Sequence, residues 1–438
     1  MIKFSSFLLI VFSLIASNLH ANEPPLPWSF AISHNLPPGE PCKDYTPAVI
    51  PNGSKANYKI IDGVKVFHLT AEAITWEVAP GFKVKTWGYN GSTPGPLIEV
   101  SEGDKVRIYV TNHLPAPTTV HWHGVLLPCG MDGVAGLTQP AIPPGETFLY
   151  EFVFPDAGTF MYHPHFDNMT QEGMGLTGMV IVHKREVDIS KRPGRDFAIM
   201  LQEWRINVGT SKPNTMRTDF NILTMNGKVM PATEPLVAEL GDIIWIRYGN
   251  LSAMSHHPIH LHGYSFKIIG SDGGWVKNKL AILPETTVLV PVGTAKVIEL
   301  LANNPGDWVF HCHMTHHTMN QMGHEFPNML GMEVGDFDEK VRQLIPGYMT
   351  MGTTGMQDMT QTGMPIPKNS IPMLGYDGPF GQTVLGGMAN ILRIRKKTEN
   401  YKDPGPYTFP RGSIASQATI GDLAKDDVDV NEFSNGNN

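Results

Sequence analysis

The stretch EPLVAELGDIIWIRYGN (residues 234–250) repeats an earlier stretch, GPLIEVSEGDKVRIYVTN (residues 95–112), with a Gly-Asp pair at matching positions. In both stretches, runs rich in β-branched and aromatic residues accompany that pair. Such residues favour β-strands, and Gly and Asp favour the turns that join strands. The chain therefore contains two copies of one β-rich unit.

Each copy continues with two histidine motifs in the same order. HWHG (121–124) and DAGTFMYHPHFDN (156–168) follow the first stretch, and HPIHLHG (257–263) and NPGDWVFHCHMTHH (304–317) follow the second. The intervening segments contain short strand-like runs, many turns with proline or glycine, and no strong helical periodicity. This pattern predicts an all-β chain with two β-sandwich domains.

The rest of the sequence differs from the two copies in composition. We predict a signal peptide at 1–21, a proline-rich extension at 22–54, sandwich domains at 55–190 and 191–337, and a methionine-rich extension and tail at 338–438. Within that last part, 348–373 is predicted to be loop and 386–396 to be a strand that packs on the second domain. The polar end from Thr408 is predicted to be disordered.

The first 21 residues indicate export. Lys3 precedes an apolar run at 4–16 that is too short for a convincing membrane span, and Ala21 offers a small residue for cleavage. No other apolar run approaches spanning length, so we expect a mature chain without a membrane span, located in the periplasm. An oxidising compartment permits disulfides, and we expect one between Cys42 and Cys129.

The charge balance argues against a nucleic-acid partner. The formal net charge is −8 and charged residues make up 17% of the chain, whereas surfaces that bind nucleic acids are basic. The unusual counts are 18 histidines and 23 methionines, which direct attention to metal binding.

Four His-x-His pairs occur at matching points of the two copies. Residues two apart in a strand point to the same side, so each pair presents two imidazoles to one place. Zinc fits a single tetrahedral set, whereas imidazole also binds copper, iron and nickel. The eight residues are His121, His123, His163, His165, His260, His262, His311 and His313.

One cysteine narrows the choice of metal. Cys312 lies between two of these histidines, so on a strand its side chain points to the opposite side. His257, His317 and Met322 lie at nearby positions of the same copy. A cysteine, two histidines and a weak methionine are the ligands of a blue-copper electron-transfer site. We therefore expect one copper on the thiolate side of this strand and further metal on its imidazole side.

Taken together, HWHG, HPHFD, HPIHLHG and the HCH-x3-H-x4-M pattern resemble the copper motifs of the multicopper oxidases, and especially of their two-domain, laccase-like bacterial branch. The resemblance implies two cupredoxin-like Greek-key β-sandwiches and four copper ions per functional unit. The ligands that it implies are His257, Cys312, His317 and Met322 for a type 1 copper, His121 and His260 for a type 2 copper, His123, His163 and His313 for one type 3 copper, and His165, His262 and His311 for the other.

The resemblance also implies an enzyme and its chemistry. A small reducing substrate, either a phenol or a metal ion such as Cu(I) or Fe(II), would give up one electron at a time near the edge of His257. Cys312 would pass each electron to a trinuclear cluster that reduces O2 to water. Asp132 matches an acid that would supply protons, whereas Thr315 occupies the position where the family often has a second acid.

Two other functions remain open from the sequence, a periplasmic copper-sequestering protein and a copper nitrite reductase. The nitrite reductases fit less well because they carry the type 1 cysteine in the first domain, where this chain has Pro164, with Thr118 and Met169 in place of the histidines. The two-domain branch further implies a homotrimer in which neighbouring chains close the clusters. The thioethers of 348–373 would suit Cu(I) if this stretch binds metal.

Overall fold

The computed structural model describes residues 37–186, 188–207, 210–278, 280, 282–318, 337–344, 377–383 and 385–429. The predicted signal peptide, the methionine-rich stretch 348–373 and the predicted ligand Met322 lie outside the described residues. The chain up to Asp403 forms one compact unit, and the chain from Pro404 forms a second.

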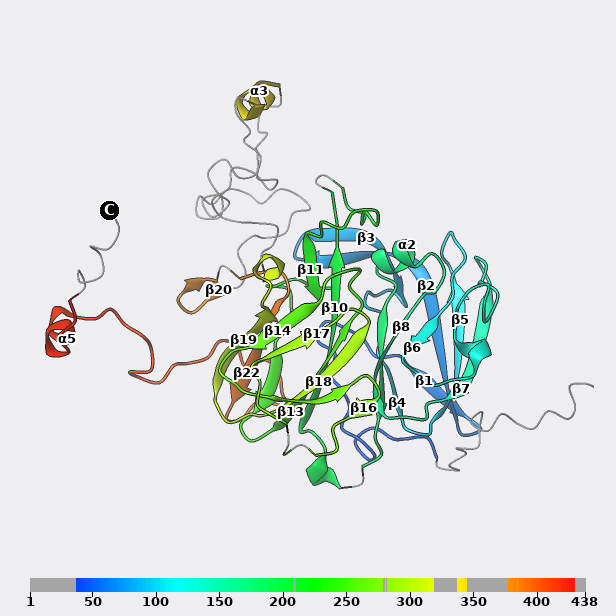
Figure 1. Cartoon of the computed structure of the whole chain (residues 1–438), viewed down its shortest axis with the longest axis horizontal. Helices are drawn as coiled ribbons and strands as arrows, with labels where there is room; N and C mark the ends of the chain where they lie inside the picture. The colour runs from blue at the N-terminus through cyan, green and yellow to red at the C-terminus, as the bar shows by residue number, and fades with distance from the viewer. Residues whose placement is uncertain are drawn as a thin grey trace, which may run out of the picture. The chain divides into compact units, whose positions relative to one another are not determined.

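The first domain is a sandwich of two sheets, drawn in blue to green in Figure 1. One sheet has the order β1-β2-β5-β7 with β3 paired to β2, and the other has the order β4-β9-β8-β6. The strands of the first sheet are β1 (Tyr58–Ile61), β2 (Val64–Ala79), β3 (Phe82–Tyr89), β5 (Lys105–Asn112) and β7 (Thr147–Val153). Those of the second are β4 (Ile98–Ser101), β6 (His121–His123), β8 (Gly158–His163) and β9 (Gly178–His183).

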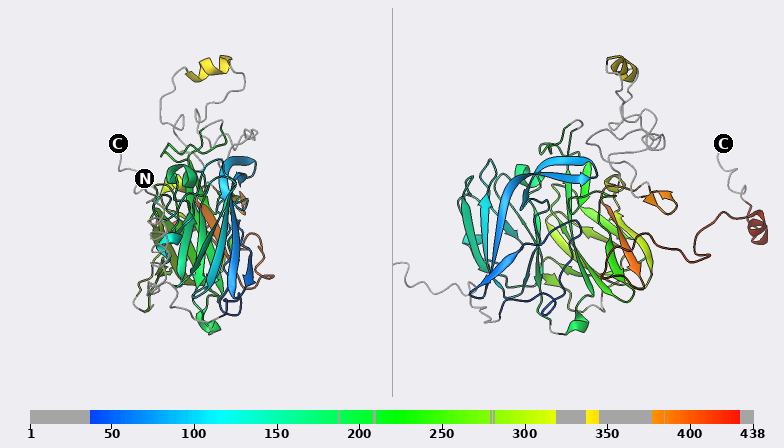
Figure 2. Two further views of the ribbon diagram at one scale, coloured as in Figure 1. Left: turned by 90° about the vertical axis from the view of Figure 1, so that its right-hand side faces the viewer. Right: turned by 180° about the vertical axis from the view of Figure 1, so that it is seen from behind.

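The second domain repeats this architecture, and Figure 2 shows the two sandwiches side by side from behind. Its sheets have the orders β11-β10-β13-β18-β15-β16 and β12-β22-β19-β14-β17. The first contains β10 (Arg195–Trp204), β11 (Ile222–Met225), β13 (Ile243–Asn250), β15 (Lys267–Ser271), β16 (Gly274–Trp275) and β18 (Thr294–Leu301). The second contains β12 (Leu236–Glu239), β14 (His257–Leu261), β17 (Thr287–Val290), β19 (Gly306–Cys312) and β22 (Ala389–Arg395).

Short elements complete the described chain. They are η1 (Cys129–Met131), α2 (Asn168–Gly173), η2 (Ile189–Lys191), η4 (Thr315–Thr318), α3 (Phe337–Leu344), β20 (Asp377–Gly378), β21 (Gly381–Gln382) and α5 (Ile420–Lys425). No helix among the described residues has the length and apolar character needed to cross a membrane.

The two stretches that opened the sequence comparison form the same turn. Asp104 accepts a hydrogen bond from the backbone N–H of Ser101, and Asp242 accepts one from Glu239, both at 2.8 Å. The glycine before each aspartate has a positive φ, +83° in the first copy and +100° in the second, which glycine adopts without strain. The duplication is therefore structural as well as sequential.

The strand after this turn also ends in the same way in both copies. Asn112 and Asn250 end β5 and β13, and each side-chain amide donates to two carbonyls of the following segments. Each side-chain oxygen accepts the N–H two residues further on, at 2.9 Å. These asparagines fix the loops that lead into the histidine strands β6 and β14.

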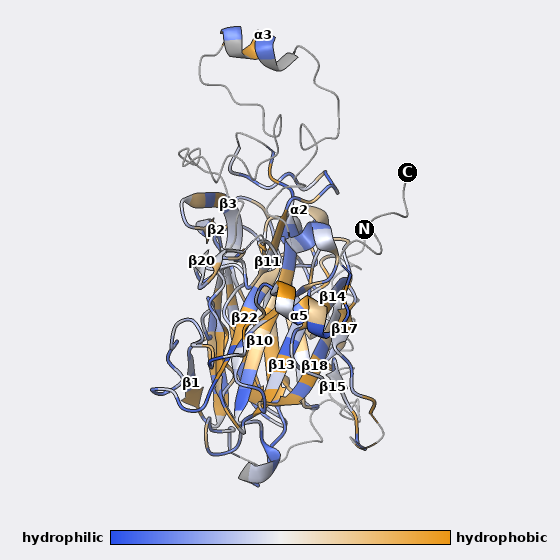
Figure 3. Ribbon diagram, turned by 90° about the vertical axis from the view of Figure 1, so that its left-hand side faces the viewer, coloured by the Kyte–Doolittle hydropathy of each residue, from blue (hydrophilic) through white to orange (hydrophobic). Residues whose placement is uncertain are grey.

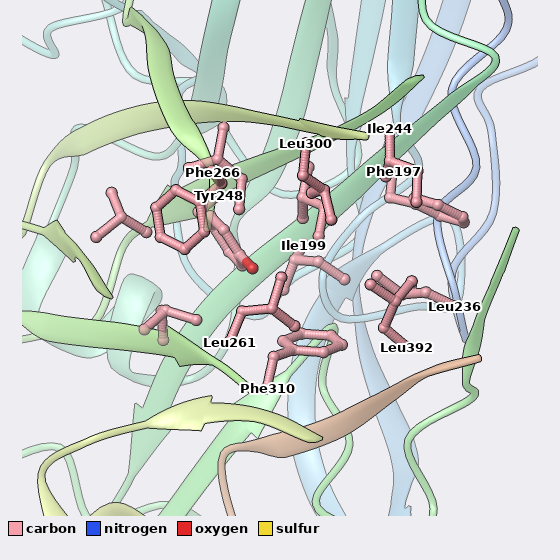
Figure 4. Close-up of a cluster of buried hydrophobic side chains, with 14 of the residues drawn as sticks. Phe197, Ile199, Leu236, Ile244, Tyr248, Leu261, Phe266, Leu300, Phe310 and Leu392 are labelled. Atoms are coloured by element: carbon pink, nitrogen blue, oxygen red, sulfur yellow. The ribbon is translucent and has the colours of Figure 1, made fainter. Parts of the chain in front are cut away.

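The core of the second domain shows how β19 is oriented. Phe310 and Cys312 belong to the buried cluster between the sheets, and Figure 4 shows Phe310 close to Leu261 within it. His311 and His313 alternate with them and face away from this cluster. Figure 3 shows the apolar stretches along β10 and β18 that contribute to the same core.

The two domains contact each other through polar and apolar groups. The hairpin of β2 and β3 packs its apolar side chains against Trp204 and the residues around β11. Arg247 of the second domain donates to Thr159 of β8 at 2.8 Å and pairs with Asp196, with both charged groups buried. Trp275 donates to the carbonyl of Ala157 at 2.7 Å.

Four predictions have a clear structural outcome. The all-β fold with two sandwiches is confirmed, and so is the strand at 386–396, because β22 pairs with β12 and β19. The predicted disorder from Thr408 is wrong for α5, which begins with a capping box between Thr419 and Asp422. The disulfide is also wrong, since Cys42 and Cys129 are both free and exposed.

Candidate metal centre

Four histidines of the first domain form one cluster, which we call the first half-site (His121, His123, His163 and His165). β6 pairs with β8 so that His121 lies opposite His163. Ring nitrogens of His121, His123 and His163 all lie within 4.8 Å of one another, and Nδ1 of His123 is 3.2 Å from Nε2 of His163. The ring of His165 is 5.6 Å from that of His121.

The outward nitrogens of this half-site are held by backbone carbonyls. Nδ1 of His121 contacts the carbonyl of Asp132 at 2.7 Å, and Nε2 of His123 contacts that of Gly293, in the second domain, at 2.8 Å. A neutral imidazole has one N–H, so donation to the carbonyl leaves the other nitrogen as an electron-pair donor toward the cluster. Burial lowers the pKa of both rings, which favours this neutral state.

The four matching histidines of the second domain form the second half-site (His260, His262, His311 and His313). β14 and β19 pair with His260 opposite His311, and Nε2 of His262 is 3.2 Å from Nε2 of His311. The ring of His313 is 5.5 Å from that of His260. Backbone carbonyls again hold outward nitrogens, that of Thr286 for His260 and that of Cys312 for His311, both at 2.8 Å.

The two half-sites remain separate within the described part of the chain. Every ring contact found between these eight imidazoles joins members of the same half-site. In the second half-site, His262 and His313 are exposed. Each half-site therefore offers four imidazoles on its own.

Cys312 forms a third cluster on the other side of β19, which we call the thiolate site. Its Sγ lies 3.7 Å from Nδ1 of His257 and 3.4 Å from Nδ1 of His317, and the two Nδ1 atoms are 3.2 Å apart. The structure thus brings together three of the four predicted type 1 ligands, while Met322 is outside the described residues.

Burial keeps the thiolate site uncharged unless a cation binds there. Burial raises the pKa of the Cys312 thiol to about 12 and lowers the pKa of His257 to about 3. The histidine is therefore a neutral ligand, whereas a buried thiolate requires a metal ion to compensate its charge. Ser252 contacts Nε2 of His257 at 2.7 Å. When Nε2 donates its proton to this hydroxyl, Nδ1 keeps an electron pair that faces the sulfur.

His257, near whose edge the entry of electrons was predicted, is buried. His257 has 0% of its surface exposed, because β14 lies between β17 and β19 in its sheet and Ser252 covers its far nitrogen. His317 lies in η4 and is partly exposed. The accessible edge of the thiolate site is therefore that of His317.

The first domain has no thiolate site at the matching place. Pro164 occupies the position of the cysteine, and α2 follows β8 where η4 follows β19. Gln171 of α2 is fully buried, accepts a hydrogen bond from Thr118 at 2.7 Å and donates to the carbonyl of Pro117 at 2.8 Å. Met169, the counterpart of the second histidine, is 58% exposed.

Asp132 lies beside the first half-site, as the sequence predicted. Its carboxylate is 3.3 Å from Nδ1 of His121. Three further side chains at these sites were not predicted from the sequence. They are Ser252, Gln171 and Glu172, and the carboxylate of Glu172 is 3.0 Å from Nδ1 of His163. Their side chains act through tertiary placement, and no motif or spacing marks them.

Comparison with known sequences identifies the family. Two family models, each described as multicopper oxidase, match residues 70–187 and 205–330, together more than half of the chain. The chain belongs to the multicopper oxidase family. The two matched segments correspond to the two sandwich domains.

Individual relatives agree with this assignment. The chain is 30% identical over 262 residues to the multicopper oxidase MmcO of Mycobacterium tuberculosis, covering 51% of this chain and 49% of MmcO. It is 40% identical over 115 residues to copper resistance protein A of Pseudomonas syringae pv. tomato, covering 26% of this chain and 18% of that protein. The matched part therefore spans about half or less of these relatives.

A solved structure with the same fold covers more of the chain. The blue copper oxidase from Nitrosomonas europaea has a TM-score of 0.55 and 27% identity, covering 75% of this chain and 85% of that one. This similarity supports the cupredoxin-like form of both sandwiches.

The donor sets of this chain fit copper. A buried cysteine between two imidazole nitrogens is the core of a blue-copper site, and clusters of neutral imidazoles without carboxylate ligands suit copper better than magnesium or calcium. In each half-site the free electron pairs converge while carbonyls hold the outward nitrogens. This is the arrangement that orients histidine ligands around a metal.

Proposed function

We propose that this chain is a laccase-like oxidase that couples one-electron oxidation of a phenolic or metal-ion substrate, such as Cu(I) or Fe(II), to the four-electron reduction of O2 to water. The observation that supports it most strongly is the arrangement of three consecutive residues. Cys312 faces the thiolate site, and its neighbours His311 and His313 belong to the second half-site on the other side of β19. A covalent path thus links an electron-accepting site to an imidazole cluster.

Each side chain has a role in this proposal. His257, Cys312, His317 and Met322 would hold one copper, and the eight half-site histidines would hold three more. Bound copper supplies one-electron transfer and the reduction of oxygen. The core around Cys312 excludes water from the sulfur. The carboxylate of Asp132 is partly exposed and lies against His121, so it can hold a proton there and exchange it with solvent.

The separation of the half-sites supports the assembly that we propose. An oxygen-reducing cluster needs both half-sites, and within one chain their rings do not meet among the described residues. The second half-site of one chain would therefore close on the first half-site of its neighbour. A head-to-tail contact forms a ring when its rotation closes, and we propose a closed ring of three chains, a homotrimer.

One relative supports Cu(I) as the substrate. The chain matches a protein named copper resistance protein A over 115 residues, and oxidation of Cu(I) would serve such a role. The location that we propose is the periplasm, because the first 21 residues have the pattern of a signal peptide. Copper sequestration without catalysis is the alternative, because the same ligands would then serve storage.

Oxygen uptake separates these possibilities. Copper-loaded protein should consume O2 when supplied with Cu(I) or a phenol, with one O2 used for four substrate electrons, and should not turn over nitrite. Sedimentation should give three chains per particle. Stable copper binding with no oxygen consumption would instead establish sequestration, and nitrite turnover would establish a reductase.

A further inference from the structure

The first half-site has an acidic neighbour on α2 that no copper motif contains. Nδ1 of His163 donates to the carbonyl of Pro164 at 2.9 Å, and the carboxylate of Glu172 lies 3.0 Å from the same nitrogen. His163 is buried, and the Glu172 side chain is only 23% exposed. The two side chains therefore meet away from bulk solvent, where a charge acts more strongly.

The placement of Glu172 is fixed by the residue before it. Gln171 is fully buried and is held at both ends of its amide, by Thr118 and by the carbonyl of Pro117. Because α2 is anchored in this way, the next side chain is held against His163. The helix that fills the place of a first-domain thiolate site thus also carries an acid to the half-site.

Among the residues that the structure describes, the matching histidine of the second domain has no such acid. His311 donates Nδ1 to the carbonyl of Cys312 at 2.8 Å, which repeats the backbone contact of His163. Among the described residues, ion-pair contacts to half-site histidines are made by Asp132 and Glu172, both in the first domain. Within the described part of the chain, carboxylates therefore lie behind the first half-site alone.

We propose that Glu172 is a positioning residue for the copper cluster, which holds the His163 ring with Nε2 toward His123 and adds negative charge behind it. This inference rests on the proposed copper function. A carboxylate behind a ligating imidazole fixes the ring and raises its basicity, and removing such a partner costs about 10–100-fold in metal affinity. The charge also offsets the positive charge of the bound ions.

The test compares Glu172→Gln with Asp156→Asn in the full chain. Glutamine keeps the shape of the side chain and removes the charge, while Asp156 is an exposed carboxylate just before the same strand β8. Copper retained per chain during titration with a chelator is the readout, together with the blue absorption of the thiolate site as an internal standard. Glu172→Gln should lose half-site copper at about 10–100-fold lower chelator concentration, with the blue absorption and the Asp156 variant unchanged.

If Glu172→Gln retains as much copper as the unmodified protein, the proposal is overturned, because packing alone would then explain the contact. Glutamine is chosen over alanine because Glu172→Ala would also remove packing and could prevent folding. If the unmodified protein holds blue copper and nothing more, the proposed oxidase function fails instead, and this result is distinct because it needs no variant.

Discussion

The two domains share one scaffold, yet they use the two sides of its histidine strand differently. On one side, β8 and β19 both present imidazoles to a half-site. On the other side, β19 places Cys312 beside two histidines, whereas β8 is followed by Pro164 and the packed helix α2. Alternate residues of a strand face opposite ways, so one face can lose a site while the other keeps its own.

The two domains also differ in which chemical groups they bring to the sites. The second domain holds the thiolate site, which accepts electrons in our proposal. The first domain holds the carboxylates Asp132 and Glu172 against its half-site. A cluster closed between two chains would thus receive electrons from one domain and have its acids supplied by the other.

The largest expected effect comes from Cys312→Ser. A hydroxyl cannot replace the thiolate as the soft ligand of blue copper, so the blue absorption should disappear and oxygen uptake should fall to background. Cys129→Ser, which removes an exposed free thiol, is the matched control. Blue absorption with full turnover in Cys312→Ser would refute the assignment of the thiolate site.

Placing a cysteine at the matching position of the first domain should not create a second blue-copper site. Pro164→Cys places a thiol at the matching point of the first domain, but Thr118 and Met169 stand where two histidines would be needed, and the Thr118 hydroxyl is already bonded to Gln171. Absorption should show one blue copper per chain, as in the unmodified protein. A second blue copper would mean that the first domain has kept its site.

These differences explain how far the sequence alone could lead. The alternation of His311, Cys312 and His313 predicted the two-sided strand because side-chain direction in a strand follows position alone. Burial of the His257 edge was not predictable, since it depends on β17 and β19 flanking β14 in the sheet. Glu172 has no sequence signal, because only the packing of α2 brings it to His163.

Asp132→Asn should produce the next largest effect. The amide keeps the turn but cannot release a proton, so oxygen reduction should slow by about 10²-fold. Anaerobic reduction of the blue copper by substrate should keep its rate, which stopped-flow absorption measures. Equal slowing of both steps would show that Asp132 supports the fold and not proton supply.

Ser252→Ala tests the thiolate site at its buried end. The change removes the hydroxyl that contacts Nε2 of His257, and the loss of such a partner should lower turnover about tenfold. The reduction potential of the blue copper, measured by redox titration, should shift with it. Ser265→Ala, at an exposed serine after β14, is the control and should change neither turnover nor potential. An unchanged reduction potential in Ser252→Ala would mean that the hydroxyl of Ser252 does not influence His257 as a ligand.

Glu99→Gln concerns stability in acid and not activity. Glu99 is buried beside His183 and Lys55, whereas the matching residue of the second domain is the buried Ala238. Burial alone would raise the pKa of Glu99, but His183 and Lys55 outweigh it and lower the pKa to about 2. The charged form is therefore favoured by folding.

The sign of the pH effect follows from this shift. A carboxyl group with a lowered folded pKa stabilises the protein above its unfolded pKa of 4.5 and loses that contribution as pH falls toward 2. Glu99→Gln should thus be less stable than the unmodified protein near neutral pH, by up to about 3 kcal/mol, and the gap should narrow below about pH 4.5. Calorimetric melting at several pH values measures it, and a gap that stays constant down to pH 3 would show that packing of the side chain, and not its charge, stabilises the first domain.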